Sequence, residues 1–229
     1  MLPRETIATA SIPGGDTLTL VNHGRDFIIM LGRDELMGTR MQFSEEQLAR
    51  LTLERLDASA PRVLIGGYGM GFTYRAALEA LPDAGEVIVA EVVPEILDWA
   101  RGPLAQLTGT CLDDARGRVV LADVAALVDD AVDGTTPRYD AILLDVDNGP
   151  DGIVREGNER LYTRTGIARL REALNPGGVL AVWSAAPDHK FTRRLKDGRL
   201  DVDVRTVRAR PNNKGPQHTI WFARRPRGS

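Results

Sequence analysis

The fold is decided by the stretch Val63-Leu64-Ile65-Gly66-Gly67-Tyr68-Gly69-Met70-Gly71, in which a short apolar run leads into a glycine-rich turn. The pattern that follows predicts a helix over residues 72–81. Glycine has no Cβ, so the backbone here can approach a ligand closely, and the free N–H groups at the start of a helix favour a polar ligand. We therefore predict that Gly67, Gly69 and Gly71 form a ligand-binding loop.

An acidic residue stands twenty positions beyond this loop, at the end of the next apolar run. The run is Val87–Ala90, and the acid is Glu91. A carboxylate at the tip of the second strand is placed to accept hydrogen bonds from ribose hydroxyls. The spacing Gly67-x-Gly69-x-Gly71 is tighter than the Gly-x-Gly-x-x-Gly of nicotinamide dinucleotide sites and is similar to S-adenosylmethionine-type loops. Loop and acid together predict a nucleoside-binding site.

Strands and helices alternate from residue 61 onward, and the strands are almost wholly apolar, which indicates a parallel sheet buried on both faces. An Asn-Pro-Gly-Gly turn at 175–178 precedes the fifth strand, and the last two strands are predicted to form an antiparallel hairpin. The expected fold is α/β, a Rossmann-like, S-adenosylmethionine methyltransferase-type seven-stranded sheet. We predict strands over 62–66, 86–91, 118–122, 139–145, 178–184, 201–208 and 217–223, and helices near 72–81, 94–102, 123–131, 163–173 and 188–196.

The first sixty residues have a different pattern. Residues 17–21 and 26–31 are strand-like and are separated by a tight-turn sequence, which predicts a β-hairpin. Ser44-Glu45-Glu46-Gln47 has the spacing of a capping box and predicts the start of a helix. We therefore expect two units: a small N-terminal β-hairpin with its connecting helix (1–58) and a Rossmann-like nucleoside-binding and catalytic domain (59–229).

Composition narrows the class of protein. The chain has 229 residues, a net charge of −3 and 43% hydrophobic residues, as expected for a globular protein without a nucleic-acid partner. One cysteine and three scattered histidines predict neither a disulfide nor a metal site. Because no apolar run approaches the ~20 residues that span a bilayer and the start lacks a signal pattern, we expect a cytoplasmic protein with no membrane partner.

Further acids stand at the ends of the third and fourth predicted strands. Asp123 follows the third strand, where an aspartate caps a helix or binds adenine, and the two roles are compatible. Asp145 ends the fourth strand after four apolar residues, so it needs a partner or a ligand. Asp147, two residues further along, is followed by Asn148 and Gly149, and this sequence is also typical of a turn. Since ligands bind at the carboxyl ends of the strands, these acids are predicted to share one site with Glu91.

Two aromatic residues are candidates for the acceptor side of that site. Trp183 lies near the end of the fifth predicted strand, and Tyr162 follows the loop 146–161. The polar composition of this loop is typical of a mobile segment that covers a site. A tryptophan such as Trp183 is more often a core residue than a substrate platform, and for Tyr162 packing in the core is an equal alternative. We list both as candidate substrate-binding residues.

From Thr17 to Arg225 the chain resembles the spermidine synthase (polyamine aminopropyltransferase) family. The resemblance lies in the order of motifs and in two segments, Glu91-Val92-Val93-Pro94-Glu95-Ile96 and Tyr139-Asp140-Ala141-Ile142-Leu143-Leu144-Asp145. It implies that Glu91 binds the ribose hydroxyls of a sulfonium nucleoside and that Asp123 binds the adenine amino group. It also implies that Asp145, helped by Asp147, orients or deprotonates the attacking amine. A homodimer acting in polyamine biosynthesis is the implied context.

The chain departs from the family pattern on the amine side. Gly69 stands where the family's GGGDGG loop carries aspartate, and Asp145-Val146-Asp147-Asn148-Gly149 replaces Asp-Ser/Thr-Ser/Thr-Asp-Pro. Phe43-Ser44-Glu45-Glu46 replaces a Tyr-His-Glu-type sequence. A diamine carries two positive charges, so it needs carboxylates to bind it. The residues that would bind the nucleoside therefore match the family pattern better than the residues that would bind the amine.

Three hypotheses about function follow. The leading one is a transferase that moves an aminopropyl group from decarboxylated S-adenosylmethionine to a small amine acceptor. The second keeps the fold and makes the protein an S-adenosylmethionine-dependent methyltransferase, which the glycine at position 69 favours. The third is a nucleoside-binding homologue without catalytic activity, since a fold does not fix a function.

Overall fold

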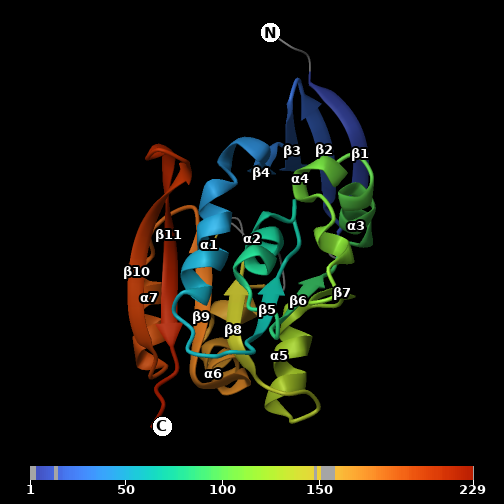
Figure 1. The fold of residues 1–229 in the computed structure, drawn as a ribbon. Coiled ribbons are helices and arrows are strands. Elements are labelled where there is room, and N and C mark those ends of the chain that lie inside the picture. The colour runs from blue at the N-terminus through green and yellow to red at the C-terminus, as the bar shows by residue number, and fades with distance from the viewer. Residues whose placement is uncertain (1–3, 13–14, 147–148, 151–157, 229) are drawn as a thin grey trace.

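The computed structural model describes residues 4–12, 15–146, 149–150 and 158–228. A small antiparallel sheet near the N-terminus stands over one end of a larger α/β unit (Figure 1). The larger sheet has seven strands in the order β10-β11-β9-β8-β5-β6-β7, of which β9 to β7 are parallel. The strands are β5 (Arg62–Gly66), β6 (Glu86–Glu91), β7 (Gly117–Leu121), β8 (Tyr139–Leu144), β9 (Leu174–Ser184), β10 (Asp201–Arg210) and β11 (Lys214–Arg224).

This order confirms the predicted methyltransferase-type sheet. The parallel strands add outward in both directions from β5, so that β5 and β8 flank the point where the order reverses. Open α/β sheets bind ligands at this switch point, beyond the carboxyl ends of the strands. The last two strands pair antiparallel with each other, and β11 pairs antiparallel with β9, as the predicted terminal hairpin requires.

Helices cover both faces of the large sheet, because successive strand residues point to opposite sides. Val63 and Ile65 face a core shared with α1, α2 and α3, whereas Leu64 faces a second core shared with α5, α6 and α7. No helix within the described ranges is long and apolar enough to cross a bilayer. The helices are α1 (Phe43–Leu53), α2 (Phe72–Ala80), α3 (Pro94–Arg101), α4 (Ala105–Thr108), α5 (Val124–Val132), α6 (Arg164–Ala173) and α7 (His189–Asp197), with short 3-10 turns η1 (Thr39–Met41), η2 (Cys111–Asp113) and η3 (Glu159–Tyr162).

The N-terminal unit is larger than predicted. The expected hairpin is present as β2 (Thr17–His23) and β3 (Asp26–Leu31), but β1 (Glu5–Ser11) and β4 (Asp34–Gly38) flank it in a four-stranded antiparallel sheet. Sequence patterning missed the outer strands because β1 is mostly exposed and β4 is short and charged. The inner face of the sheet joins the same apolar core as α1 and β5, through residues such as Leu20 and Ile29.

Two local predictions were wrong in detail. The turn expected at 175–178 lies within β9, where Gly177 adopts a φ of +86° and its N–H donates to the carbonyl of Arg225 (2.8 Å). The capping box at Ser44 is absent, because Gln42 precedes the first turn of α1 and no side chain caps it. The Ser44 hydroxyl instead lies 2.8 Å from His218 Nδ1.

Candidate functional site

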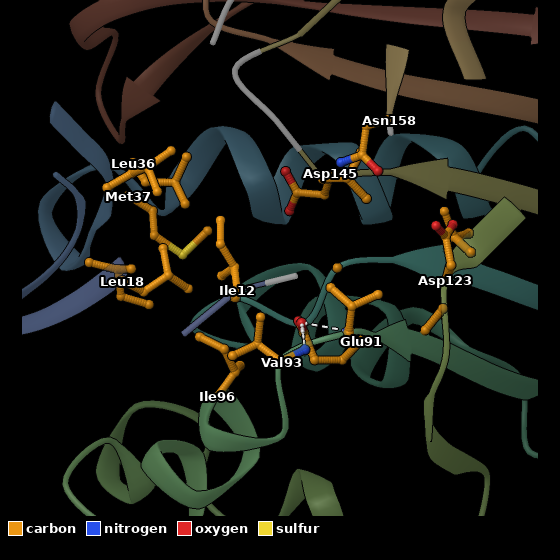
Figure 2. Close-up of a pocket in the computed structure, with 18 of the residues that line it drawn as sticks. Ile12, Leu18, Leu36, Met37, Glu91, Val93, Ile96, Asp123, Asp145 and Asn158 are labelled. Carbon is orange, nitrogen blue, oxygen red and sulfur yellow. Dashed lines mark hydrogen bonds between the residues drawn. The ribbon is translucent and has the colours of Figure 1, made fainter. Parts of the chain in front are cut away.

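A pocket lies at the carboxyl ends of the central strands, under the N-terminal sheet (Figure 2). Figure 2 shows apolar side chains, including Leu18, Leu36 and Met37, at one end and Asp123 at the other, with Glu91 and Asp145 between them. The predicted glycines and acids that line it are Gly67, Gly69, Glu91, Asp123 and Asp145. The pocket therefore offers one apolar wall and one acidic wall to a ligand.

The glycine loop runs close to its neighbours. Gly67 adopts a φ of +83°, and a Cβ built there would lie 2.7 Å from the backbone oxygen of Asp145. Its own N–H donates to Ala90 O (2.9 Å), which joins the loop to β6. Gly69 has a φ of +55° and faces the methyl group of Met37, and Gly71 (φ +79°) precedes the first turn of α2. Only glycine takes these left-handed angles at low cost, so the loop's close approach depends on its composition.

Glu91 ties this loop to the end of β6. Its Oε2 accepts a hydrogen bond from the N–H of Tyr68 (2.9 Å), and its Oε1 accepts from Val92 (2.7 Å) and Val93 (2.9 Å). The residue is 7% exposed and lines the pocket. An ionised carboxylate offers about four acceptor positions. Three are used here, which leaves capacity for a ligand hydroxyl.

Asp123 has the predicted capping role. Its Oδ1 accepts from the N–H of Ala125 at the start of α5 (2.9 Å), and its Oδ2 accepts from the Arg160 guanidinium (2.8 Å). The Arg160 side chain is 58% exposed, so this ion pair is open to water and contributes little to stability. Its proposed contact with adenine stays a prediction.

Asp145 stands just beyond the end of β8, at the switch point of the sheet. Its Oδ2 accepts a hydrogen bond from Thr73 Oγ1 (2.6 Å) in the first turn of α2. Burial raises the pKa of Asp145 to about 6, because the charged carboxylate loses contact with water, and the Thr73 hydrogen bond opposes this rise. A carboxylate with this pKa is ionised at neutral pH and close enough to it to exchange a proton. Asp147 lies outside the described residues.

The two aromatic candidates lie in the core. Tyr162 is 3% exposed, packs edge-on against Phe191 (ring centroids 5.7 Å apart) and is not among the pocket-lining residues. Trp183 donates from Nε1 to Ser44 Oγ (3.1 Å) and packs edge-on against His218 (4.7 Å). Their substrate-binding roles stay predictions, and their visible contacts are those of packed residues.

Glu45 was not among the predicted site residues. It occupies the first turn of α1 and is 7% exposed. Burial raises the pKa of Glu45 well above its usual value, and the neighbouring charges of Asp145 and Glu46 raise it further. The structure thus brings a second buried carboxyl group to the neighbourhood of Asp145.

No group of three or more His, Cys, Asp and Glu residues suited to a metal ion occurs in the described part of the chain.

The known proteins that are similar to this chain in sequence share one name. The chain is 30% identical over 118 residues to a polyamine aminopropyltransferase of Pyrobaculum calidifontis, a stretch covering 52% of this chain and 39% of the relative. It is 30% identical over 129 residues to the enzyme of the same name from Mycobacterium tuberculosis, covering 56% of this chain and 23% of that one. The resemblance to spermidine synthases is confirmed. The matched stretch spans less than half of either relative, and no family model matches the chain.

Solved structures extend the resemblance to the whole fold. Spermidine synthase from Thermotoga maritima superimposes with a TM-score of 0.74 at 21% identity, covering 97% of this chain and 73% of that one. A spermidine synthase in complex with the transition state analogue AdoDATO gives a TM-score of 0.73 at 21% identity, with 97% and 72% coverage. The spermidine synthase-like fold therefore includes the N-terminal sheet as well as the seven-stranded sheet.

Proposed function

We propose that this protein is an aminopropyltransferase that uses decarboxylated S-adenosylmethionine as donor and a small amine as acceptor. The observation that carries the proposal is one pocket lined by Gly67 and Gly69 of the glycine loop, Glu91 and Asp145 at the switch point of the sheet. The names of the relatives support the same reaction rather than methyl transfer or a protein without activity.

The proposed donor contacts use groups with spare capacity. Glu91 holds a ribose hydroxyl through its remaining acceptor position, and Asp123 receives the adenine amino group. Gly67 and Gly69 leave room for the donor beside the loop. The apolar wall around Met37 and Ile96 suits the uncharged parts of the nucleoside, because it excludes water from them.

The reaction needs alignment and one proton acceptor. The attacking ammonium first gives one proton to Asp145, which frees the lone pair of its nitrogen. The nitrogen then attacks the aminopropyl carbon beside the sulfonium, a C–N bond forms, the C–S bond breaks, and methylthioadenosine leaves as a neutral thioether. The Asp145 pKa of about 6 leaves this residue ionised at neutral pH and basic enough to accept the proton. Asp147 is its proposed helper.

The test is direct product analysis. Purified protein is incubated with decarboxylated S-adenosylmethionine and a series of α,ω-diamines, and mass spectrometry follows methylthioadenosine and the aminopropylated amine. S-adenosylmethionine replaces the donor in a parallel reaction, where a methylated product would show the methyltransferase instead. Calorimetry with both donors accompanies these reactions. Binding of neither donor would contradict both transferase hypotheses.

Three broader expectations remain proposals. We propose that the protein is a homodimer, that it works in the cytoplasm on polyamine precursors, and that its chain divides into units at 1–58 and 59–229. Light scattering measures the assembly state. Limited proteolysis followed by mass spectrometry tests whether cleavage concentrates near residue 58, as the division into two units requires.

A further inference from the structure

The end of the pocket under the N-terminal sheet is apolar (Figure 2). Leu18 of β2 and Ile29 of β3 are 5% and 1% exposed and belong to the core beneath the small sheet. Among the described residues, the N-terminal sheet contributes no charged side chain to the pocket. The residues that line this end, which we call the apolar end, are Ile12, Leu18, Ile29, Leu31, Leu36 and Met37.

The pairing of β3 with β4 brings two consecutive side chains to the apolar end. Ile29 pairs with Met37 across the two strands. Met30 pairs with Glu35, so the register shifts and leaves Leu36 without a direct partner on β3. Consecutive strand residues normally point to opposite faces, and a bulge re-aims one of them. Leu36 and Met37 therefore both line the pocket.

Met37 also fills the space beside the glycine loop. A Cβ built at Gly69 would lie 2.6 Å from Met37 Cε and 2.9 Å from its Sδ. The described carboxylates that line the pocket, Glu91, Asp123 and Asp145, all stand at or just beyond the ends of strands of the large sheet. A charged group at the apolar end would therefore meet hydrocarbon and a thioether in place of water.

The proposed position of the donor determines which group reaches the apolar end. In an adenosyl sulfonium the base and the sulfur are attached to carbons on opposite sides of the ribose. With the adenine at Asp123 and the ribose at Glu91, the sulfonium points away from Asp123 and toward the apolar end (Figure 2). The attacking nitrogen approaches opposite the breaking C–S bond, so the rest of the acceptor extends further in the same direction.

We propose that the apolar end binds an uncharged hydrocarbon tail of the acceptor, which makes the preferred acceptor a monoamine with an alkyl or aryl tail. This rests on the proposed function and narrows its acceptor amine. A hydrocarbon tail is transferred there from water to an apolar surface, which is favourable. The second ammonium of an α,ω-diamine would lose its water without gaining a carboxylate of the described residues as a partner, which is costly.

The first test compares amines that differ only in their tails. Calorimetry of the protein saturated with methylthioadenosine measures the binding of butylamine, hexylamine and 1,6-diaminohexane. We expect hexylamine to bind roughly tenfold more tightly than butylamine, because two more methylene groups leave water. We expect 1,6-diaminohexane to bind at least roughly tenfold less tightly than hexylamine. The rate of methylthioadenosine formation from decarboxylated S-adenosylmethionine should follow the same order.

The second test places a charge at the apolar end. Leu36→Asp adds a carboxylate there, and Leu36→Asn is a variant of the same size without the charge. Val204→Asp is the matched control, because Val204 is 43% exposed on β10 and does not line the pocket. Leu36→Asp should bind 1,6-diaminohexane roughly tenfold more tightly than the original protein does. Leu36→Asn and Val204→Asp should show no such gain, and thermal unfolding verifies that all three variants are folded.

Two results would overturn the apolar acceptor tail. One is an original protein that binds 1,6-diaminohexane as tightly as hexylamine, or hexylamine no more tightly than butylamine. The other is an equal gain in diamine affinity in Leu36→Asp and Leu36→Asn. Formation of methylthioadenosine with diamines alone would overturn the tail and support the proposed function. The proposed function fails together with it if the original protein forms no methylthioadenosine from the donor with any amine.

Discussion

The two halves of the pocket treat their carboxylates differently. On the proposed nucleoside side, Glu91 accepts three backbone N–H groups and Asp123 accepts one N–H and an arginine. On the proposed amine side, Asp145 accepts a single hydroxyl from the described residues. The first two acids hold the backbone in place before any ligand arrives. Asp145 retains most of its acceptor positions, as a group that takes up a proton must.

The largest expected effect is on the amine side. Asp145→Asn removes the proposed proton acceptor and should lower kcat by about 10²–10⁴-fold, the usual contribution of a general base. Methylthioadenosine should bind as before, because the nucleoside contacts remain. Steady-state kinetics measures kcat, and calorimetry measures the affinity for methylthioadenosine. A kcat within a few-fold of the original would show that Asp145 is not the base.

On the proposed nucleoside side, the largest loss of stability and donor affinity is expected from a substitution at Gly67. Gly67→Ala adds a Cβ 2.7 Å from the Asp145 backbone oxygen at a φ of +83°. Gly134 is a matched control, because its φ is +80° and a Cβ there meets nothing within 4 Å. Gly134→Ala should lower the free energy of unfolding by about 1 kcal/mol. Gly67→Ala should cost about 1–3 kcal/mol more and weaken donor binding.

Urea denaturation of the two glycine variants gives both values. Equal losses of unfolding free energy in the two variants would show that the left-handed backbone angle alone accounts for the need for glycine at position 67. The close approach between the loop and the end of β8 would then not be required.

Glu91→Gln tests whether one acid serves both the loop and the ligand. A glutamine has only one acceptor oxygen, so at least one backbone N–H loses its partner, at about 1–3 kcal/mol. Affinity for methylthioadenosine should fall by roughly tenfold to a hundredfold. The analogue lacking both ribose hydroxyls should bind the variant and the original protein more nearly equally. An undiminished preference for the ribose hydroxyls in the variant would remove Glu91 from ribose recognition.

The smallest effect is the contribution of Glu45 to the pH dependence of stability. The pKa of Glu45 is higher in the folded protein than in the unfolded chain, so its contribution to stability is full below its unfolded pKa and is lost as pH rises through the folded pKa. Glu45→Gln cannot ionise and should therefore be more stable relative to the original at pH 8 than at pH 5. Urea denaturation at both pH values measures this, and a parallel decline in both proteins would contradict it.

The large sheet was predictable because its strands are nearly all apolar and its helices begin at recognisable residues, such as Pro94 at the first turn of α3. The acids at the strand ends were predictable from the same sheet, since parallel strands deliver their carboxyl ends to one edge. The outer strands β1 and β4 were not, because their residues lack an apolar face of their own. The burial of Glu45 was not predictable from its sequence, because it depends on the packing of α1 against α2 and the large sheet.

The contact between Ser44 and His218 joins residues 174 positions apart. At a synthesis rate of about 5–20 residues per second, strand β11 follows α1 from the ribosome by roughly 10–35 s. During that interval the Ser44 hydroxyl lacks His218, one of the two side chains that contact it; the other is Trp183. The contacts around the first turn of α1 are therefore completed only when β11, the last strand of the chain, pairs with β9.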